Sequence, residues 1–293
     1  MRFNCSCPPA YTGQWCETLK HPRNCKDVAR NGAKISGRFR VYDSQNKPFQ
    51  VYCDLTHEPG YVWTLIQSFS YGNNDQFKVK RFGLDFPVNE EASTINWSAY
   101  RLSLSRMQSL AVSSTHFRAT CNFPDGLVYT DYARAKLEGH DLFGQWYTQC
   151  RTYEYLNIRD IECNECTAGT WQNNEMWHLN SERSVSTAGC EFNGEVGAVP
   201  HEQNFGYYIY FNVNFRCTSR QNSTTQHWIG SRKWIITKPR FCYFGTRRTN
   251  VRNECILMAP AAQFFLLLLW AFGHRWLISK WNLKLEQESE YMY

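Results

Sequence analysis

The chain has 293 residues, of which 43% are hydrophobic and 16% aromatic, so it can bury a substantial core and is not an intrinsically disordered chain. Its net charge of +6 comes mainly from residues 216–256, where nine Lys/Arg residues stand against Glu254. The rest of the chain is therefore near neutral, which excludes a polyanion and argues against a nucleic-acid-binding face. Thirteen cysteines indicate an oxidising compartment and disulfide bonds.

Residues 1–19 contain three closely spaced cysteines, Cys5, Cys7 and Cys16, within the run NCSCPPAYTGQWC. This spacing resembles the last third of an EGF-like module. The resemblance implies a Cys7–Cys16 disulfide and leaves Cys5 for a cysteine further upstream. We therefore expect the sequence to begin inside a longer protein, because no apolar signal-peptide core follows Met1. The alternative is a short tail with one local loop.

Two segments, 35–43 and 47–55, alternate apolar and polar residues and are rich in β-branched and aromatic residues. The turn-forming run DSQNKP separates them, so the pattern predicts two paired strands. Cys25 and Cys53 bracket this region, and a disulfide between them would tie the strands together.

The same region resembles the opening of the fibrinogen C-terminal domain. The matching pieces occur in the family's order, and they are Asn24-Cys25, Gly32 to Arg38, Pro48 to Asp54 and Trp63 to Gln67. The resemblance implies an α+β fold over residues 20–237, with a mixed or antiparallel sheet, short helices and several disulfides.

The next segments follow the family less closely. Residues 69–77 read as a loop because of their Gly-Asn-Asn-Asp content. Residues 102–111 predict a short helix, 115–123 predict a strand, and 128–143 resemble the step that follows in the family. The core residues expected here are Trp97, Leu102, Met107, Leu110 and Phe117.

Six further cysteines are expected to form disulfides: Cys121, Cys150, Cys163, Cys166, Cys190 and Cys217. Cys163 and Cys166 form a CxxC pair in acidic, loop-like surroundings. With His178 and Cys190 they could be read as a zinc site, but a structural zinc site usually needs two such pairs. A redox motif would need a strand and helix around the CxxC, and the surrounding pattern provides neither.

Calcium requires clustered oxygen ligands. Asn173, Asn174 and Glu175 are the nearest such cluster, and they read more readily as solvated loop residues. We therefore expect neither a metal nor another cofactor.

Residues 206–217, GYYIYFNVNFRC, are nearly all β-formers and predict a strand. Aromatic residues in and after it could stack on sugar rings if exposed, although core packing accounts for them more simply. They are Tyr207, Tyr208, Tyr210, His227 and Trp228. In many fibrinogen-related domains this C-terminal region forms the binding pocket. Three acceptor sequons, at Asn4, Asn96 and Asn222, fit a secreted glycoprotein, and Asn222 has the most accessible surroundings.

Beyond a basic linker at 238–254, the sequence contains a candidate membrane anchor at 255–278 and a charged tail at 279–293. Residues 255–273 carry no charge and are long enough to span a bilayer. The basic residues before this segment disfavour a type I orientation, and the charged tail disfavours a GPI signal. The third interpretation is that the sequence after about residue 237 is a misread exon or intron.

No catalytic motif stands out, because the histidines are scattered and no nucleophile elbow or paired carboxylates are present. We expect a non-enzymatic, secreted binding or matrix protein that recognises extracellular glycans or matrix proteins. The resemblance extends to fibrinogen-related proteins of cnidarians, including components of coral skeletal organic matrix. The alternatives are a single-pass adhesion or receptor protein, anchored through 255–273, and a secreted enzyme.

Overall fold

The computed structural model describes residues 7–14, 16–181 and 189–233. The strands are β1 (Tyr11–Thr12), β2 (Thr18–Leu19), β3 (Gly37–Tyr42), β4 (Pro48–Asp54), β5 (Tyr61–Ser70), β6 (Ala99–Arg101), β7 (His116–Cys121), β8 (Tyr132–Lys136), β9 (Trp146–Ile158), β10 (Ile161–Gln172), β11 (His178–Asn180), β12 (Gln203–Asn204) and β13 (Thr224–Arg232). The helices are α1 (Cys25–Arg30), α2 (Asn74–Phe77) and α3 (Leu104–Ala111), and the 3-10 turns are η1 (Tyr71–Asn73) and η2 (Phe123–Asp125).

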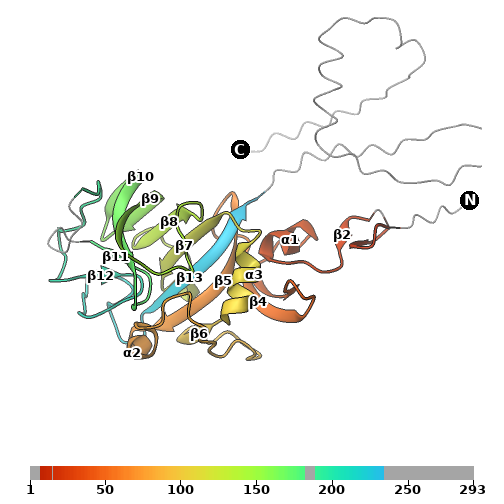
Figure 1. Ribbon diagram of the computed structural model, residues 1–293, viewed down its shortest axis with the longest axis horizontal. Coiled ribbons are helices and arrows are strands. Elements are labelled where there is room, and N and C mark those ends of the chain that lie inside the picture. The colour runs from red at the N-terminus through yellow and green to blue at the C-terminus, as the bar shows by residue number, and fades with distance from the viewer. Residues whose placement is uncertain (1–6, 15, 182–188, 234–293) are drawn as a thin grey trace, which may run out of the picture. The chain divides into compact units, whose positions relative to one another are not determined.

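Most of the described strands join one large antiparallel sheet (Figure 1). Its order is β12-β11-β10-β9-β8-β7-β13-β5-β4-β3, and β6 pairs with β5 beside this path. The last described strand, β13, thus lies between two strands from the first half of the chain, β5 and β7. The expected α+β domain is therefore mainly an antiparallel sheet with a few short helices.

The predicted pair of strands at 35–43 and 47–55 is confirmed as β3 and β4. Their antiparallel register places Gly37 opposite Cys53. The Asp43 carboxylate closes the turn by accepting hydrogen bonds from the backbone N–H groups of Gln45 and Lys47, both at 2.8 Å. An aspartate at the start of a turn commonly stabilises it in this way.

The core forms around β5, because all ten of its residues are buried. The predicted helix at 102–111 is confirmed as α3, and Met107 and Leu110 on its inner face are fully buried. Leu102 and Phe117 are also buried, whereas Trp97 is half-buried and packs against the core. These positions were expected in the core, and they hold α3 and β7 against it.

Three local predictions were wrong. Residues 69–77 are not a loop, because Phe69 and Ser70 end β5 and the rest forms η1 and α2. The CxxC segment is not loop-like, since it lies inside β10 and pairs with β9. Residues 206–217 are not a strand but a folded loop, in which buried and exposed side chains do not alternate.

The small hairpin of β1 and β2 lies beside α1. The side chain of Asn31 accepts a hydrogen bond from the Leu19 N–H at 2.8 Å and donates one to the Leu19 carbonyl at 2.9 Å. This reciprocal pair connects the N-terminal hairpin to the end of α1.

Within the described residues, no helix has both the length and the apolar character needed to cross a bilayer. The candidate anchor at 255–273 lies outside the described residues.

Candidate functional site

The candidate site is the loop of residues 205–218, between β12 and β13. Its backbone forms no strand, yet several of its side chains point into the protein. Phe205, Tyr208, Phe215 and Cys217 are at most 3% exposed. These side chains fix the loop to the end of the sheet.

Tyr208 is the central anchor of the loop. Its carbonyl accepts a hydrogen bond from the Asn74 side chain at 2.7 Å, and its hydroxyl lies 2.6 Å from the Thr225 hydroxyl on β13. Burial raises the pKa of the Tyr208 phenol, so this group stays neutral. Because β13 and α2 both hold Tyr208, the loop conformation depends on two elements far apart in the sequence.

Asn212 anchors the middle of the loop. Its side-chain amide donates to the Gly197 carbonyl at 3.0 Å and to a Glu202 carboxylate oxygen at 2.9 Å. Its carbonyl accepts a hydrogen bond from the Thr218 hydroxyl at 2.9 Å. An asparagine that satisfies backbone groups in this way favours a turn over a strand, which explains why the strand prediction failed here.

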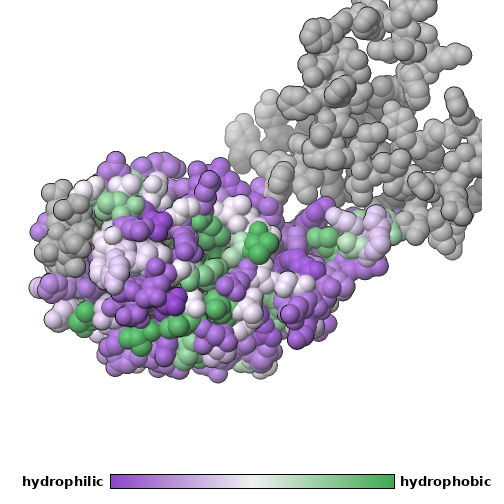
Figure 2. Space-filling model, in the orientation of Figure 1, coloured by the Kyte–Doolittle hydropathy of each residue, from purple (hydrophilic) through white to green (hydrophobic). Residues whose placement is uncertain are grey.

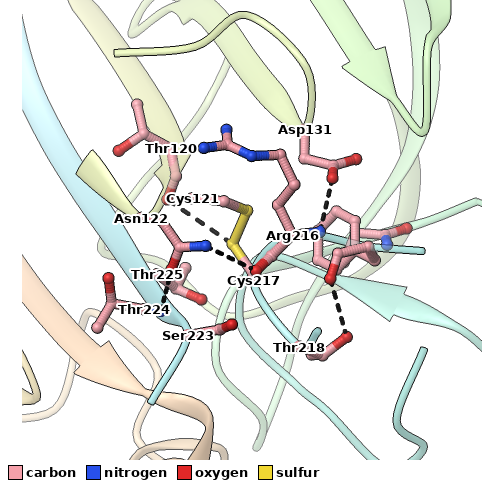
Figure 3. Close-up of a disulfide and its surroundings, with 12 residues drawn as sticks. Thr120, Cys121, Asn122, Asp131, Arg216, Cys217, Thr218, Ser223, Thr224 and Thr225 are labelled. Atoms are coloured by element: carbon pink, nitrogen blue, oxygen red, sulfur yellow. Dashed lines mark hydrogen bonds between the residues drawn. A yellow bond between two sulfur atoms is a disulfide. The ribbon is translucent and has the colours of Figure 1, made fainter. Parts of the chain in front are cut away.

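The C-terminal end of the loop is fixed by a disulfide between Cys121 on β7 and Cys217 (Figure 3). Beside it, the Asn122 side chain donates to the Arg216 carbonyl at 3.1 Å and accepts from the Thr224 N–H at 2.7 Å. The disulfide therefore lies where β7, the loop and β13 meet.

Asp131 connects this region to the β9–β10 turn. Its two carboxylate oxygens accept hydrogen bonds from the backbone N–H groups of Arg159 and Arg216, both at 2.7 Å. Burial raises the pKa of Asp131 to about 6, although these two hydrogen bonds and the nearby arginines oppose the rise. The charge state of Asp131 can therefore change in mildly acidic solution.

The outer side of the loop exposes four apolar side chains. Ile209 is 48% exposed, Tyr210 52%, Phe211 43% and Val213 62%. The rings of Phe211 and Tyr71 lie 5.6 Å apart, so the exposed group extends toward η1. In the space-filling view the surface is largely hydrophilic, and small hydrophobic groups are scattered over it, some of them at the lower left, over the loops near β12 and α2 (Figure 2).

The aromatic residues expected in this region separate into two groups. Tyr208, His227 and Trp228 are at most 3% exposed, in agreement with core packing. Tyr207 is half-buried and Tyr210 is exposed. Among these five residues, only Tyr207 and Tyr210 are therefore accessible to a ligand.

All ten cysteines named above as disulfide candidates are paired in the structure. The pairs are Cys7–Cys16, Cys25–Cys53, Cys121–Cys217, Cys150–Cys190 and Cys163–Cys166. The first two are the pairs expected from the sequence. Because Cys163 and Cys166 are bonded to each other, their sulfur atoms are not placed to bind zinc.

The residues considered for calcium are engaged with neighbouring side chains. The side-chain oxygens of Asn173 and Asn174 accept hydrogen bonds from Gln145, and Glu175 accepts one from the Trp171 indole. Across residues 7–14, 16–181 and 189–233, no three His, Cys, Asp or Glu side chains cluster in a way that could hold a metal ion.

A network of charged side chains is buried in the sheet. The guanidinium of Arg118 lies between the rings of Trp63 and Trp228, with its carbon 4.7 and 4.5 Å from their centroids. It donates to Asp54 at 2.7 Å and to Glu58 at 2.9 Å. Burial alone would raise the pKa of Asp54, but Arg118 and the His57 N–H lower it to about 2.

The same network brings an acid and a base together. His116 Nε2 lies 3.3 Å from Glu154, which also accepts a hydrogen bond from Arg134 at 3.1 Å. Burial lowers the pKa of His116, although Glu154 opposes the shift. Burial would raise the pKa of Glu154, but His116 and Arg134 lower it. A carboxylate paired with arginine in this way serves as an ion-pair partner more readily than as a proton donor.

Two predicted glycosylation sites lie on the surface. Asn96 and Asn222 are both exposed. The Asn96 side chain also accepts a hydrogen bond from the Ser98 N–H at 3.1 Å, which closes a local turn. Asn4 lies outside the described residues.

Sequence reasoning missed the exposed side chains of Ile209, Phe211 and Val213 and the role of Asp131. The one signal against a strand was the presence of two asparagines, Asn212 and Asn214, in this run of β-formers, since asparagine is depleted in strands. Nothing in the sequence around Asp131 indicates its two distant backbone partners.

A family model described as "Fibrinogen beta and gamma chains, C-terminal globular domain" matches residues 21–84. This segment runs from the approach to α1 through β3, β4 and β5 to the turn after α2. The match supports a fibrinogen C-terminal-like domain. No curated protein matches the chain in a sequence search.

Proposed function

We propose that the chain is a non-enzymatic extracellular recognition protein, which binds matrix proteins or glycans through the 205–218 loop. The observation that carries this proposal is the exposure of four apolar side chains on a loop whose backbone is fixed from within. A skeletal organic matrix is one setting that the sequence resemblance suggests.

The physical argument is preorganisation. Exposed apolar side chains lower the solubility of a protein and usually mark a contact surface when they gather in one place. A loop already held by Tyr208, Asn212 and the Cys121–Cys217 disulfide loses little conformational entropy when it binds. Ile209, Tyr210, Phe211 and Val213 are thus suited to form the centre of an interface.

The test is a binding assay with the secreted protein. Wild-type protein and a Tyr210→Ser/Phe211→Ser variant are compared on immobilised matrix proteins and glycans from the native tissue. We expect the variant to lose at least tenfold in affinity, since central aromatic residues often contribute about 2 kcal/mol or more. A Val112→Ser variant is the control, because Val112 is 89% exposed and lies at the C-terminal end of α3, outside the 205–218 loop. Equal binding by all three proteins would exclude the loop as the contact surface.

The extracellular location is tested by chemistry of the isolated protein. We propose that the five disulfides are native, and peptide mapping without reduction should recover Cys7–Cys16 and Cys25–Cys53 as linked peptides. Free thiols at these positions would contradict the proposal. The two exposed sequons provide a second readout, and we expect Asn222→Gln and Asn96→Gln each to remove one glycan from the mass of the secreted protein.

An anchored adhesion or receptor protein is the second candidate function. It is favoured by the uncharged run at 255–273. If peptides beyond Arg252 are recovered from the detergent fraction of native tissue, the anchored form is correct. If the protein is extracted by buffer and these peptides are missing at good coverage elsewhere, it is a soluble matrix component.

A further inference from the structure

A strip of aromatic rings crosses the strands at the β12 end of the sheet. The rings of Tyr147 on β9 and Trp171 on β10 lie 5.7 Å apart, nearly perpendicular at 89°. Trp171 is followed by His178 on β11, at 6.4 Å, and His178 by Tyr207 at the start of the 205–218 loop, at 5.4 Å. We call these four residues the aromatic strip. Its strands lie side by side in Figure 1.

The strip is accessible at one end and supported at its centre. Tyr147 is 67% exposed, Trp171 and Tyr207 are half-buried, and His178 is 3% exposed. Trp171 lies directly opposite His178 in the β10–β11 pairing. Its indole N–H donates to Glu175 at 2.9 Å, so the orientation of the ring is fixed from both sides.

Amide side chains lie next to the aromatic strip. The Gln145 side chain, two residues before Tyr147, donates to Asn173 at 2.6 Å and to Asn174 at 3.3 Å. Gln145 and Asn174 are exposed. Each amide carries both a donor and an acceptor, so the group can still offer the Asn173 and Asn174 NH₂ groups and the Gln145 oxygen to a ligand.

We infer that the aromatic strip and its amides form a binding site for a neutral oligosaccharide. One face of a sugar ring presents C–H groups, which pack on aromatic rings, while its hydroxyls both donate and accept hydrogen bonds. Aromatic side chains give such contacts at little entropic cost, and amides match hydroxyls in both roles. Glu175 is the one acidic residue among those named, and its carboxylate already accepts the Trp171 N–H, which favours a neutral ligand.

This site is separate from the four exposed apolar side chains of the proposed contact surface, and it does not depend on them. The oligosaccharide would bind at β9, β10 and β11. In this part of the chain the sequence alone indicated a CxxC pair and an unsupported calcium cluster. A protein with both surfaces could hold a glycan chain and a protein partner at once.

The test is titration of the full chain with neutral oligosaccharides of β-linked glucose, galactose and N-acetylglucosamine, followed by calorimetry. Tyr147→Ala should weaken binding about tenfold, as expected for the loss of one aromatic contact. Tyr147→Phe keeps the ring and should stay within about twofold of wild type, on the same reasoning. Because Tyr147 is 67% exposed, neither change should unfold the protein.

Tyr129→Ala is the matched control, since Tyr129 is 40% exposed and packs near Tyr132 and Tyr155, away from the strip. It should bind like wild type. The inference is overturned if none of these oligosaccharides binds at millimolar concentration, or if Tyr147→Ala binds as tightly as wild type. The Tyr210→Ser/Phe211→Ser variant separates the two proposals, because neither residue belongs to the aromatic strip. If this variant keeps the oligosaccharide affinity and Tyr147→Ala loses it, the strip is the glycan site; if only the loop variant loses it, the glycan binds at the 205–218 loop and the inference is overturned.

Discussion

The guanidinium of Arg118 lies 2.7 Å from the carboxylate of Asp54, and neither side chain has any exposed surface. The pair joins β7 to β4, and Glu58 adds a second carboxylate at 2.9 Å from the same guanidinium. Arg118 is thus shared by two buried carboxylates, and Glu58 has a second cation in Arg134, 2.5 Å from its other oxygen.

Arg118→Met should strongly destabilise the fold, because it leaves Asp54 with no other cation at its second oxygen. Removing one member of a buried ion pair typically costs about 3 to 5 kcal/mol in free energy of unfolding. Urea unfolding followed by fluorescence measures the change. Arg40→Met, at an exposed position of β3, is the control and should change the free energy by about 0.5 kcal/mol or less. Similar values for the two variants would contradict the assigned role of Arg118.

Asp131 predicts a pH dependence of stability. Its pKa is about 6 in the folded protein and 3.8 in the reference state, so the folded state binds more protons between these values. The stabilisation that Asp131 contributes to the free energy of unfolding is therefore fully present below about pH 4. It is lost as the pH rises through 6, and the loss is about 3 kcal/mol at most.

Asp131→Asn removes this titration, although it also loses one backbone hydrogen bond. Compared with the variant, the wild type should lose stability as the pH rises from 4 to 6.5, measured by urea unfolding at each pH. The slope is the diagnostic quantity, since the lost hydrogen bond shifts the variant equally at every pH. Parallel curves for the two proteins would show that Asp131 does not titrate in this range.

Removal of different disulfides should lower the stability of the protein by different amounts. Cys121 and Cys217 are 96 residues apart, whereas Cys163 and Cys166 are three apart. On the chain-entropy relation the first bond contributes roughly 4.7 kcal/mol and the second roughly 2 kcal/mol. Thermal unfolding of the two double alanine variants should show this order. The Cys121→Ala/Cys217→Ala variant should also weaken partner binding through the 205–218 loop.

The hydrogen bonds of Asn31 should stabilise the N-terminal hairpin against local opening. Asn31→Ala removes both hydrogen bonds to Leu19. We expect the Leu19 amide to exchange its hydrogen about fivefold faster or more, since one lost hydrogen bond is commonly worth about 1 kcal/mol. Amide exchange followed by mass spectrometry of residues 8–20 measures this. Unchanged exchange would show that the disulfide between Cys7 and Cys16 holds the hairpin without help from α1.

The sequence by itself determined the parts of the fold whose signals are local. Residues 37–54 carry their alternation, their turn and the Asp43 cap within one short segment, so the β3–β4 pair could be predicted. The helix α3 and the strand β7 were predicted for the same reason. The cysteine count likewise indicated a disulfide-bonded domain before any pairing was known.

The tertiary structure decided what depends on distant partners. Residues 206–217 have the composition of a strand, but Tyr208 is held by Asn74, 134 residues away, and Cys217 by Cys121. Periodicity along a chain reports which residues prefer burial, and it carries no information about which distant group will cover them. The aromatic strip spans three strands, the loop is held by α2, β7 and β13, and Asp131 meets backbone groups of two distant segments. All three therefore emerge only when the sheet is assembled.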